Sequence, residues 1–119
     1  MAAKTTYALL IYRAGPDPTP GEDRRALAAH RAVQSQASAR GELHAVARLG
    51  EASAAKTVRL RRGAHATTDG PYIETKEWLV GFYLIDCASE DEALERARTI
   101  CPIEGHAIEV RAVDWRWQP

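Results

Sequence analysis

The chain has 119 residues, of which 45% are apolar and 27% charged, a composition typical of one globular domain with its own core. The 16 basic and 16 acidic side chains give a formal net charge of zero, so no long-range field attracts nucleic acid or an anionic membrane. No apolar run approaches the roughly 18 residues of a membrane helix, and Met1–Thr6 lacks the apolar core of a signal peptide. We therefore expect a single cytoplasmic domain over residues 1–119, with neither nucleic acid nor membrane as a partner.

The first strand and the first helix are marked by a change in apolar spacing. Tyr7–Tyr12 is almost continuously apolar, which is typical of a strand that is covered on both faces. Thr19–Glu22 has the composition of a helix start, with a capping threonine, a proline at the first helical position and a glutamate that completes a capping box. The helix is predicted from about residue 20 to 39, with His30 on its apolar stripe. That stripe is Ala26, Ala29, His30, Val33 and Ala37, and the charged face is Glu22, Arg24, Arg31 and Gln34.

The middle of the chain alternates with the period of a strand. Leu43–Leu49 and Lys56–Arg62 both alternate, and Ala64–Thr68 is predicted to return from the second as a hairpin. Trp78–Ile85 is apolar throughout, which predicts a central strand, and Gly81 within it indicates a bulge or a close approach by another group. In the first alternating run, one face holds Leu43, Ala45, Ala47 and Leu49, and the other holds His44, Val46 and Arg48.

The end of the chain supplies a second helix and a last strand. Ser89–Glu92 is a second capping box that opens a helix to about Ile100, and His106–Val113 alternates as a strand. The order of the elements predicts an α+β fold, a ferredoxin-like sandwich with two helices on one face of an antiparallel sheet. Because two helices cover only one face, we expect a second copy to cover the other in a homodimer. Residues 114–119 are interpreted as a C-terminal extension.

The segment with the most chemistry is the loop before the central strand. Asp69-Gly70-Pro71 is strong turn chemistry, but a turn does not require the aromatic, acid and base that follow it. Asp69 suits either an Asx-turn or a site carboxylate. Tyr72 suits either packing or a cleft wall, and Glu74 with Lys76 suits either a solvated salt bridge or a pocket.

Five stretches of the chain, in order, match the pattern of one known family: Tyr7–Tyr12, the helix histidine His30, Thr68–Asp86, Asp91–Leu94 with Cys101-Pro102, and Ile108–Arg111. On these stretches the sequence resembles the YCII-related family, in the branch of DGPF-domain proteins. Two substitutions depart from its pattern, because Tyr72 replaces the usual phenylalanine and Val80 the usual glycine.

The resemblance implies a ferredoxin-like fold, sheets that pair as a dimeric α/β barrel, and an active-site cleft that uses His30 and Asp69. The wider superfamily of this family resembles muconolactone isomerases, and some DGPF-domain members are encoded with extracytoplasmic-function sigma factors. Two functions follow as hypotheses. One is an isomerase or lyase of a small acid, with His30 and Asp69 as an acid/base pair and Tyr72, Glu74 and Lys76 binding substrate. The alternative is a non-catalytic ligand-binding or regulatory module, in which His30 is a core histidine.

The sequence contains no pattern that is typical of a metal site or a cofactor site. His44, His65 and His106 stand without metal-ligand spacing, and Cys87 and Cys101 fit the pattern of free thiols. We therefore expect neither a metal nor another cofactor. The two tryptophans of the tail, Trp115 and Trp117, suit covering a sheet or dimer edge or stacking on a ligand.

Overall fold

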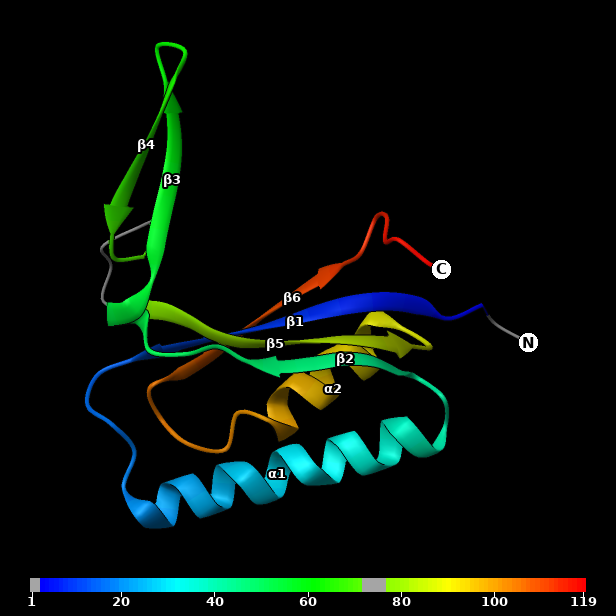
Figure 1. Ribbon diagram of the computed structural model, residues 1–119. Coiled ribbons are helices and arrows are strands. Elements are labelled where there is room, and N and C mark those ends of the chain that lie inside the picture. The colour runs from blue at the N-terminus through cyan, green and yellow to red at the C-terminus, as the bar shows by residue number, and fades with distance from the viewer. Residues whose placement is uncertain (1–2, 72–76) are drawn as a thin grey trace.

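A four-stranded antiparallel sheet with both helices on one face forms the body of the protein (Figure 1). The computed structural model describes residues 3–71 and 77–119. The strand order β2-β5-β1-β6, with every neighbouring pair antiparallel, is that of a ferredoxin-like sandwich and confirms the predicted fold class. The elements are β1 (Thr5–Ala14), α1 (Pro20–Ala39), β2 (Leu43–Arg48), the 3-10 turn η1 (Ala52–Ala54), β3 (Lys56–Arg61), β4 (Ala64–Asp69), β5 (Glu77–Cys87), α2 (Glu90–Thr99) and β6 (His106–Ala112).

The helices begin where their capping residues predict. At the start of α1 the Thr19 hydroxyl accepts the Glu22 N–H at 3.2 Å, and the Glu22 carboxylate accepts the Thr19 N–H at 2.9 Å. This is the complete capping box that the sequence predicts. At α2 only half of the predicted box forms, because Ser89 accepts the Glu92 N–H while the Glu92 carboxylate accepts from Ala88 instead.

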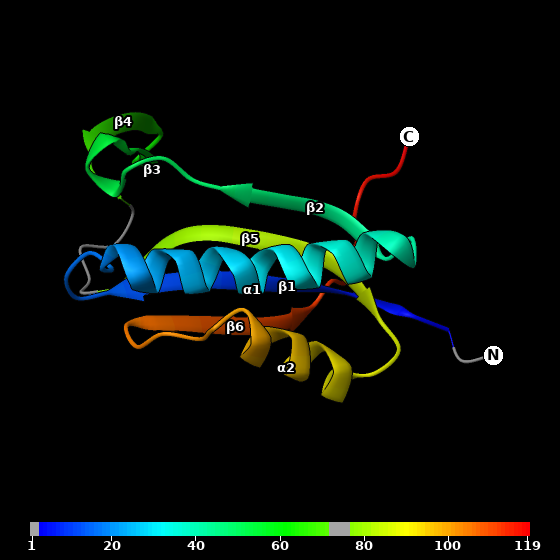
Figure 2. The ribbon, with the colours of Figure 1, turned by 90° about the horizontal axis from the view of Figure 1, so that it is seen from below.

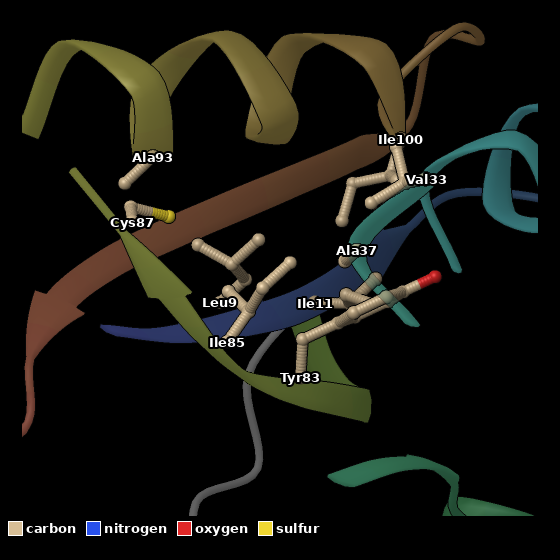
Figure 3. Close-up of a cluster of buried hydrophobic side chains, with 9 residues drawn as sticks. All are labelled: Leu9, Ile11, Val33, Ala37, Tyr83, Ile85, Cys87, Ala93 and Ile100. Atoms are coloured by element: carbon tan, nitrogen blue, oxygen red, sulfur yellow. The ribbon is translucent and has the colours of Figure 1, made fainter. Parts of the chain in front are cut away.

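The core lies between the sheet and the two helices (Figure 3). Strands β1 and β5 supply its largest fully buried side chains, Leu9, Tyr83 and Ile85. The Tyr83 ring lies along the cluster, and its hydroxyl points away from the end where Cys87 lies (Figure 3). The cluster comprises Leu9, Ile11, Val33, Ala37, Tyr83, Ile85, Cys87, Ala93 and Ile100.

Strand β5 has a bulge against β1 and a close approach to β2, both beside Gly81. Val80 is an extra residue in β5, because Ile11 pairs with Gly81 while the next residue of β1 pairs with Leu79. This is the bulge that Gly81 predicts, and the close approach is present too. A Cβ on Gly81 would lie 2.7 Å from the Ala47 carbonyl oxygen.

Strands β3 and β4 form a separate two-stranded hairpin that projects from the sheet face opposite the helices (Figure 1). The predicted hairpin is therefore confirmed. Val58 and Leu60 on it are 62% and 65% exposed. Two hydrogen bonds of Gly70 hold the base of the hairpin. The Gly70 N–H donates to the Ala55 carbonyl at 2.7 Å, and the Gly70 carbonyl accepts from the Thr57 hydroxyl at 2.8 Å.

A buried ion pair joins the second helix to the chain before β2. Arg96 and Glu42 are 4% and 3% exposed, and the guanidinium of Arg96 donates to the Glu42 carboxylate. Lys4 also contacts Glu42 at 2.8 Å, and Arg96 donates to the Asp86 carbonyl at 2.8 Å. Every charged group in this cluster has a partner, as burial of charge requires.

The sheet face opposite the helices is left without a covering layer by the described part of the chain. Leu10, Phe82 and Leu84 alternate with the core residues and lie on this face, where they are half-buried. The C-terminal tail leaves β6 on the same side (Figure 1). Of the helices in residues 3–71 and 77–119, none is long and apolar enough to span a membrane.

Candidate functional site

A cavity of about 640 Å³ lies between α1 and the sheet. Seen from the helix side, α1 runs across β5 and β1 while β2 lies to one side of it (Figure 2). The cavity walls come from α1, from the three strands β1, β2 and β5, and from the start of β6. This volume is in the range of small-molecule sites.

His30 lies in the wall of this cavity and is held by Tyr83. Its Nδ1 is 2.6 Å from the Tyr83 hydroxyl oxygen, and the two rings stack with centroids 5.7 Å apart and planes 16° from parallel. The Gln34 amide donates to the same hydroxyl at 3.1 Å. His30 and Gln34 are one helical turn apart on α1, so both reach the Tyr83 hydroxyl from one face. The sequence placed Gln34 on the charged outer face, and this hydrogen bond shows that placement to be wrong.

The surroundings of His30 favour a neutral ring. Burial lowers the pKa of His30 below its ordinary value of 6.5, and the nearby His106 lowers it further. Burial raises the pKa of Tyr83 above 10.0, although its hydrogen bond from Gln34 opposes this. At pH 7 the pair is therefore a neutral imidazole and a neutral phenol. The Nδ1 contact leaves Nε2 as the ring nitrogen without a protein partner among the described residues.

Charged side chains around the cavity are mostly basic. Arg13, Arg24 and Arg48 line it together with one carboxylate, Asp23. Arg48 faces the cavity because β2 has a bulge at His44, which shifts the register so that Arg48 pairs with Gly81. The alternation of a regular strand predicted that Arg48 lies on the face away from Leu43, Ala45 and Ala47. Nothing in the sequence indicated the bulge.

The cavity wall at β1 and β6 contains two buried polar atoms without a partner in the described chain. These atoms are Nε of Arg13 and Nδ1 of His106. Both side chains line the cavity, and the two residues are directly opposite each other in the β1–β6 pairing. Burial lowers the pKa of His106, and the positive charge of Arg13 lowers it further, against the smaller opposing effect of Asp23 and Glu22.

The predicted partner of His30 lies elsewhere in the described structure. Asp69 ends β4 at the base of the hairpin, where its exposed carboxylate pairs with Lys56. It is not among the residues that line the cavity, and no described contact joins it to His30. The acid/base pairing of the two stays a prediction. Tyr72, Glu74 and Lys76, the predicted substrate-binding residues, lie outside the described residues.

A different histidine and aspartate do meet. His44 Nε2 lies 2.9 Å from Asp86 Oδ2, the Thr6 hydroxyl donates to the other carboxylate oxygen at 2.6 Å, and Arg116 of the tail lies 3.3 Å from the same His44 nitrogen. Burial tends to raise the pKa of Asp86, but these contacts outweigh it and lower the pKa below 3.8. None of the four lines the cavity, so they anchor the tail and strand ends away from it.

The two cysteines have the surroundings of structural residues. Cys87 is fully buried, and burial raises its thiol pKa, which opposes formation of the thiolate. Cys101 is half-buried, and neither cysteine forms a disulfide in the described chain. Within residues 3–71 and 77–119, no three histidine, cysteine or acidic side chains gather closely enough to hold a metal ion.

Comparison with known proteins assigns the chain to a family. Residues 5–117 match the YCII-related domain, which accounts for nearly all of the chain. The chain belongs to the YCII-related family. This YCII-related protein is also 51% identical over 79 residues to an uncharacterized protein of Rhizobium meliloti (strain 1021). That alignment covers 66% of this chain and 64% of the relative, so the match spans less than two thirds of the relative's own length.

The sequence predicted that His30 faces the sheet, but it did not predict the side chains that His30 contacts. Tyr83 sits in an apolar strand, where its hydroxyl is one polar atom within a hydrophobic run. Arg13 and His106 belong to two strands more than 90 residues apart in the chain, and only the β1–β6 register brings them together. The available signal was the i, i+4 spacing of His30 and Gln34 on α1.

Proposed function

We propose that this YCII-related protein, in the DGPF branch that Asp69-Gly70-Pro71 indicates, transfers protons on a small organic acid in the cavity beside α1. The observation that carries the proposal is the His30–Tyr83 contact of 2.6 Å in the wall of a cavity of about 640 Å³. A buried neutral imidazole is suited to accept a proton near pH 7. Tyr83 engages Nδ1 of the ring, and in the tautomer with the proton on Nδ1 the basic nitrogen is Nε2.

The proposed step is an isomerisation through an enolate. With Nδ1–H donated to Tyr83, the Nε2 lone pair of His30 takes a proton from the carbon between a carbonyl group and a carbon–carbon double bond. The C–H electron pair moves into the conjugated system to form a dienolate, and the basic side chains of the cavity stabilise the negative charge on its oxygen. The imidazolium then returns its proton to the far carbon of the former double bond, so the double bond shifts and the reaction needs no other reactant.

Asp69 enters the proposal as the second proton-transfer group, and Tyr72, Glu74 and Lys76 as groups that bind the substrate. Asp69 lies at the base of the hairpin that projects from the open sheet face, where we also propose that a second copy packs. The half-buried apolar side chains Leu10, Phe82 and Leu84 on that face support this pairing. Sedimentation equilibrium gives the molecular mass directly, and a monomer at high protein concentration would contradict the pairing.

Deuterium exchange tests the proton transfer without knowledge of the substrate. Wild-type protein would be incubated in D₂O with small unsaturated and 2-oxo acids, and loss of each acidic C–H would be followed by ¹H NMR. We expect exchange that His30→Gln removes and that His65→Gln, on the exposed hairpin, leaves intact. Asp69→Asn is expected to reduce the exchange. Equal exchange in wild type and His30→Gln would contradict the role of His30.

The second candidate is a non-catalytic ligand-binding module, of the kind encoded with an extracytoplasmic-function sigma factor. The exposed ion pair of Asp69 with Lys56, away from the cavity lining, favours this candidate. It predicts that acids bind in the cavity without any exchange of their C–H protons. Saturable binding with no exchange in any of the acids would therefore decide for the module.

A further inference from the structure

The wall of the cavity opposite β2 contains a cross-strand pair of an arginine and a histidine. Arg13 on β1 is directly opposite His106 on β6, and both line the cavity. Side chains that face each other in an antiparallel pair lie close together on one side of the sheet. The two side chains therefore lie next to each other in the same part of the cavity wall.

Each member of this pair has a buried polar atom that the described chain leaves without a hydrogen bond. Nε of Arg13 is one, and Nδ1 of His106 is the other. A buried donor without an acceptor costs about 1–3 kcal/mol, which is why such atoms in native proteins call for an explanation. Here both atoms belong to one neighbouring pair at one cavity, which makes one shared acceptor group the simplest partner for them.

The position of Arg13 is fixed on its other side. Its Nη2 contacts Asp17 at 3.2 Å, and this carboxylate is itself exposed to solvent. The contact orients the guanidinium plane and leaves Nε for another partner. Arg24 and Arg48 add positive charge around the cavity, and Asp23 is the acidic residue that lines it. The balance of charge favours an anionic ligand.

We propose that Arg13 and His106 bind the carboxylate of a small organic acid, with one carboxylate oxygen accepting from Arg13 Nε–H and the other from His106 Nδ1–H. Two donors on adjacent strands match the two oxygens of a carboxylate, whereas a phosphate has more oxygens to satisfy. The proposal rests on the proposed function, because it takes the cavity of His30 as the ligand site. It assigns one end of the ligand to Arg13 and His106 and leaves the other end beside His30.

Paired ligands test the assignment. Crotonate, benzoate and 2-oxobutanoate would each be titrated against the matching neutral amide, and also against inorganic phosphate, with binding followed by isothermal calorimetry and amide NMR shifts. We expect at least one acid to bind and its amide not to bind. Arg13→Gln is expected to weaken the acid about 10- to 100-fold, as for loss of a charged hydrogen bond, and Arg31→Gln, on the exposed face of α1, to leave it unchanged.

Stability separates a ligand-binding role from a structural one. A structural role predicts that Arg13→Gln and His106→Phe lower the stability of the ligand-free protein. The proposed role predicts unchanged or higher stability without ligand, because each change removes the buried nitrogen that has no hydrogen-bond partner in the described chain. His106→Asn, which keeps a donor, is expected to lose less affinity than His106→Phe.

Two outcomes would overturn the proposal. One is equal affinity of acid and amide, or of wild type and Arg13→Gln. The other is phosphate competing more strongly than every acid, which would assign the pair to a different anion. Deuterium exchange keeps this test separate from the proposed function. If acids bind through Arg13 but show no exchange, the binding role of Arg13 and His106 stands and the proton transfer does not. If exchange occurs with the same KM in Arg13→Gln as in wild type, the proton transfer stands and the binding role does not.

Discussion

The imidazole Nδ1 of His30 and the hydroxyl oxygen of Tyr83 lie 2.6 Å apart, although the residues are 53 positions apart in the chain. One comes from the helix that covers the sheet and the other from the central strand beneath it. The contact therefore depends on how α1 docks on β5. It fixes the imidazole in the cavity wall. Whether Tyr83 donates or accepts in this hydrogen bond also determines which ring nitrogen of His30 carries the proton.

Tyr83→Phe is expected to free the His30 ring with little damage to the core, since the phenyl ring keeps the packing. Loss of the hydroxyl removes its hydrogen bonds with His30 and Gln34. We expect the free energy of unfolding to fall by about 1 kcal/mol. Chemical denaturation measures that change, and unchanged His30 ring resonances in the variant would show that the contact is absent in solution.

Gly81→Ala tests the close approach beside the cavity. The added Cβ would lie 2.7 Å from the Ala47 carbonyl oxygen, so β2 has to move away from β5. We expect a loss of about 1–3 kcal/mol in the free energy of unfolding. Gly50→Ala is the matched control, because a Cβ there meets nothing within 4 Å, and its effect is expected to stay within about 0.5 kcal/mol. Equal effects of the two changes would contradict the tight contact.

The elements of the fold were predictable because their signals are local. The Thr19 capping box, the Gly81 bulge and the β3–β4 hairpin each follow from a few neighbouring residues. The site was predictable only in part. The apolar stripe of α1 predicts that His30 faces the sheet, and its role in a site was implied by the family resemblance alone. Its contact with Tyr83 and the Arg13–His106 pairing depend on the register between distant segments. A bulge at His44 also exchanges the two faces of β2 for the residues that follow it. Residues 43–48 contain no glycine or proline that would indicate this bulge.

The buried pair of Arg96 and Glu42 is predicted to carry far more stability than a surface pair on the same helix. Arg96→Met leaves the Glu42 carboxylate buried with only Lys4 as its charged partner. We expect a loss of about 3–5 kcal/mol. Arg98→Met breaks an exposed pair with Glu95 and is expected to cost at most about 1 kcal/mol. Urea unfolding of both variants measures the two losses of stability. Similar midpoints for the two variants would contradict a larger contribution from the buried pair.

The stability of the protein is predicted to fall as the pH is lowered from 6.5. Burial lowers the pKa of both His30 and His106 below that value, so the unfolded chain takes up protons on these residues before the folded protein does. The free energy of unfolding therefore decreases with decreasing pH between 6.5 and the lowered pKa values. His30→Gln is expected to reduce this slope. Denaturation between pH 5 and 7 measures it, and an identical slope in the variant would place His30 in solvent.

The central claim is that the cavity beside α1, with His30 in its wall, is the ligand site of this YCII-related protein. The most direct test is ¹³C–¹H NMR of the four histidine rings during titration with a bound organic acid. We predict saturable shifts of the His30 and His106 resonances, while His65 on the hairpin and His44 beside Asp86 stay unchanged. Shifts confined to His44 or His65, with His30 unaffected at saturation, would contradict the account.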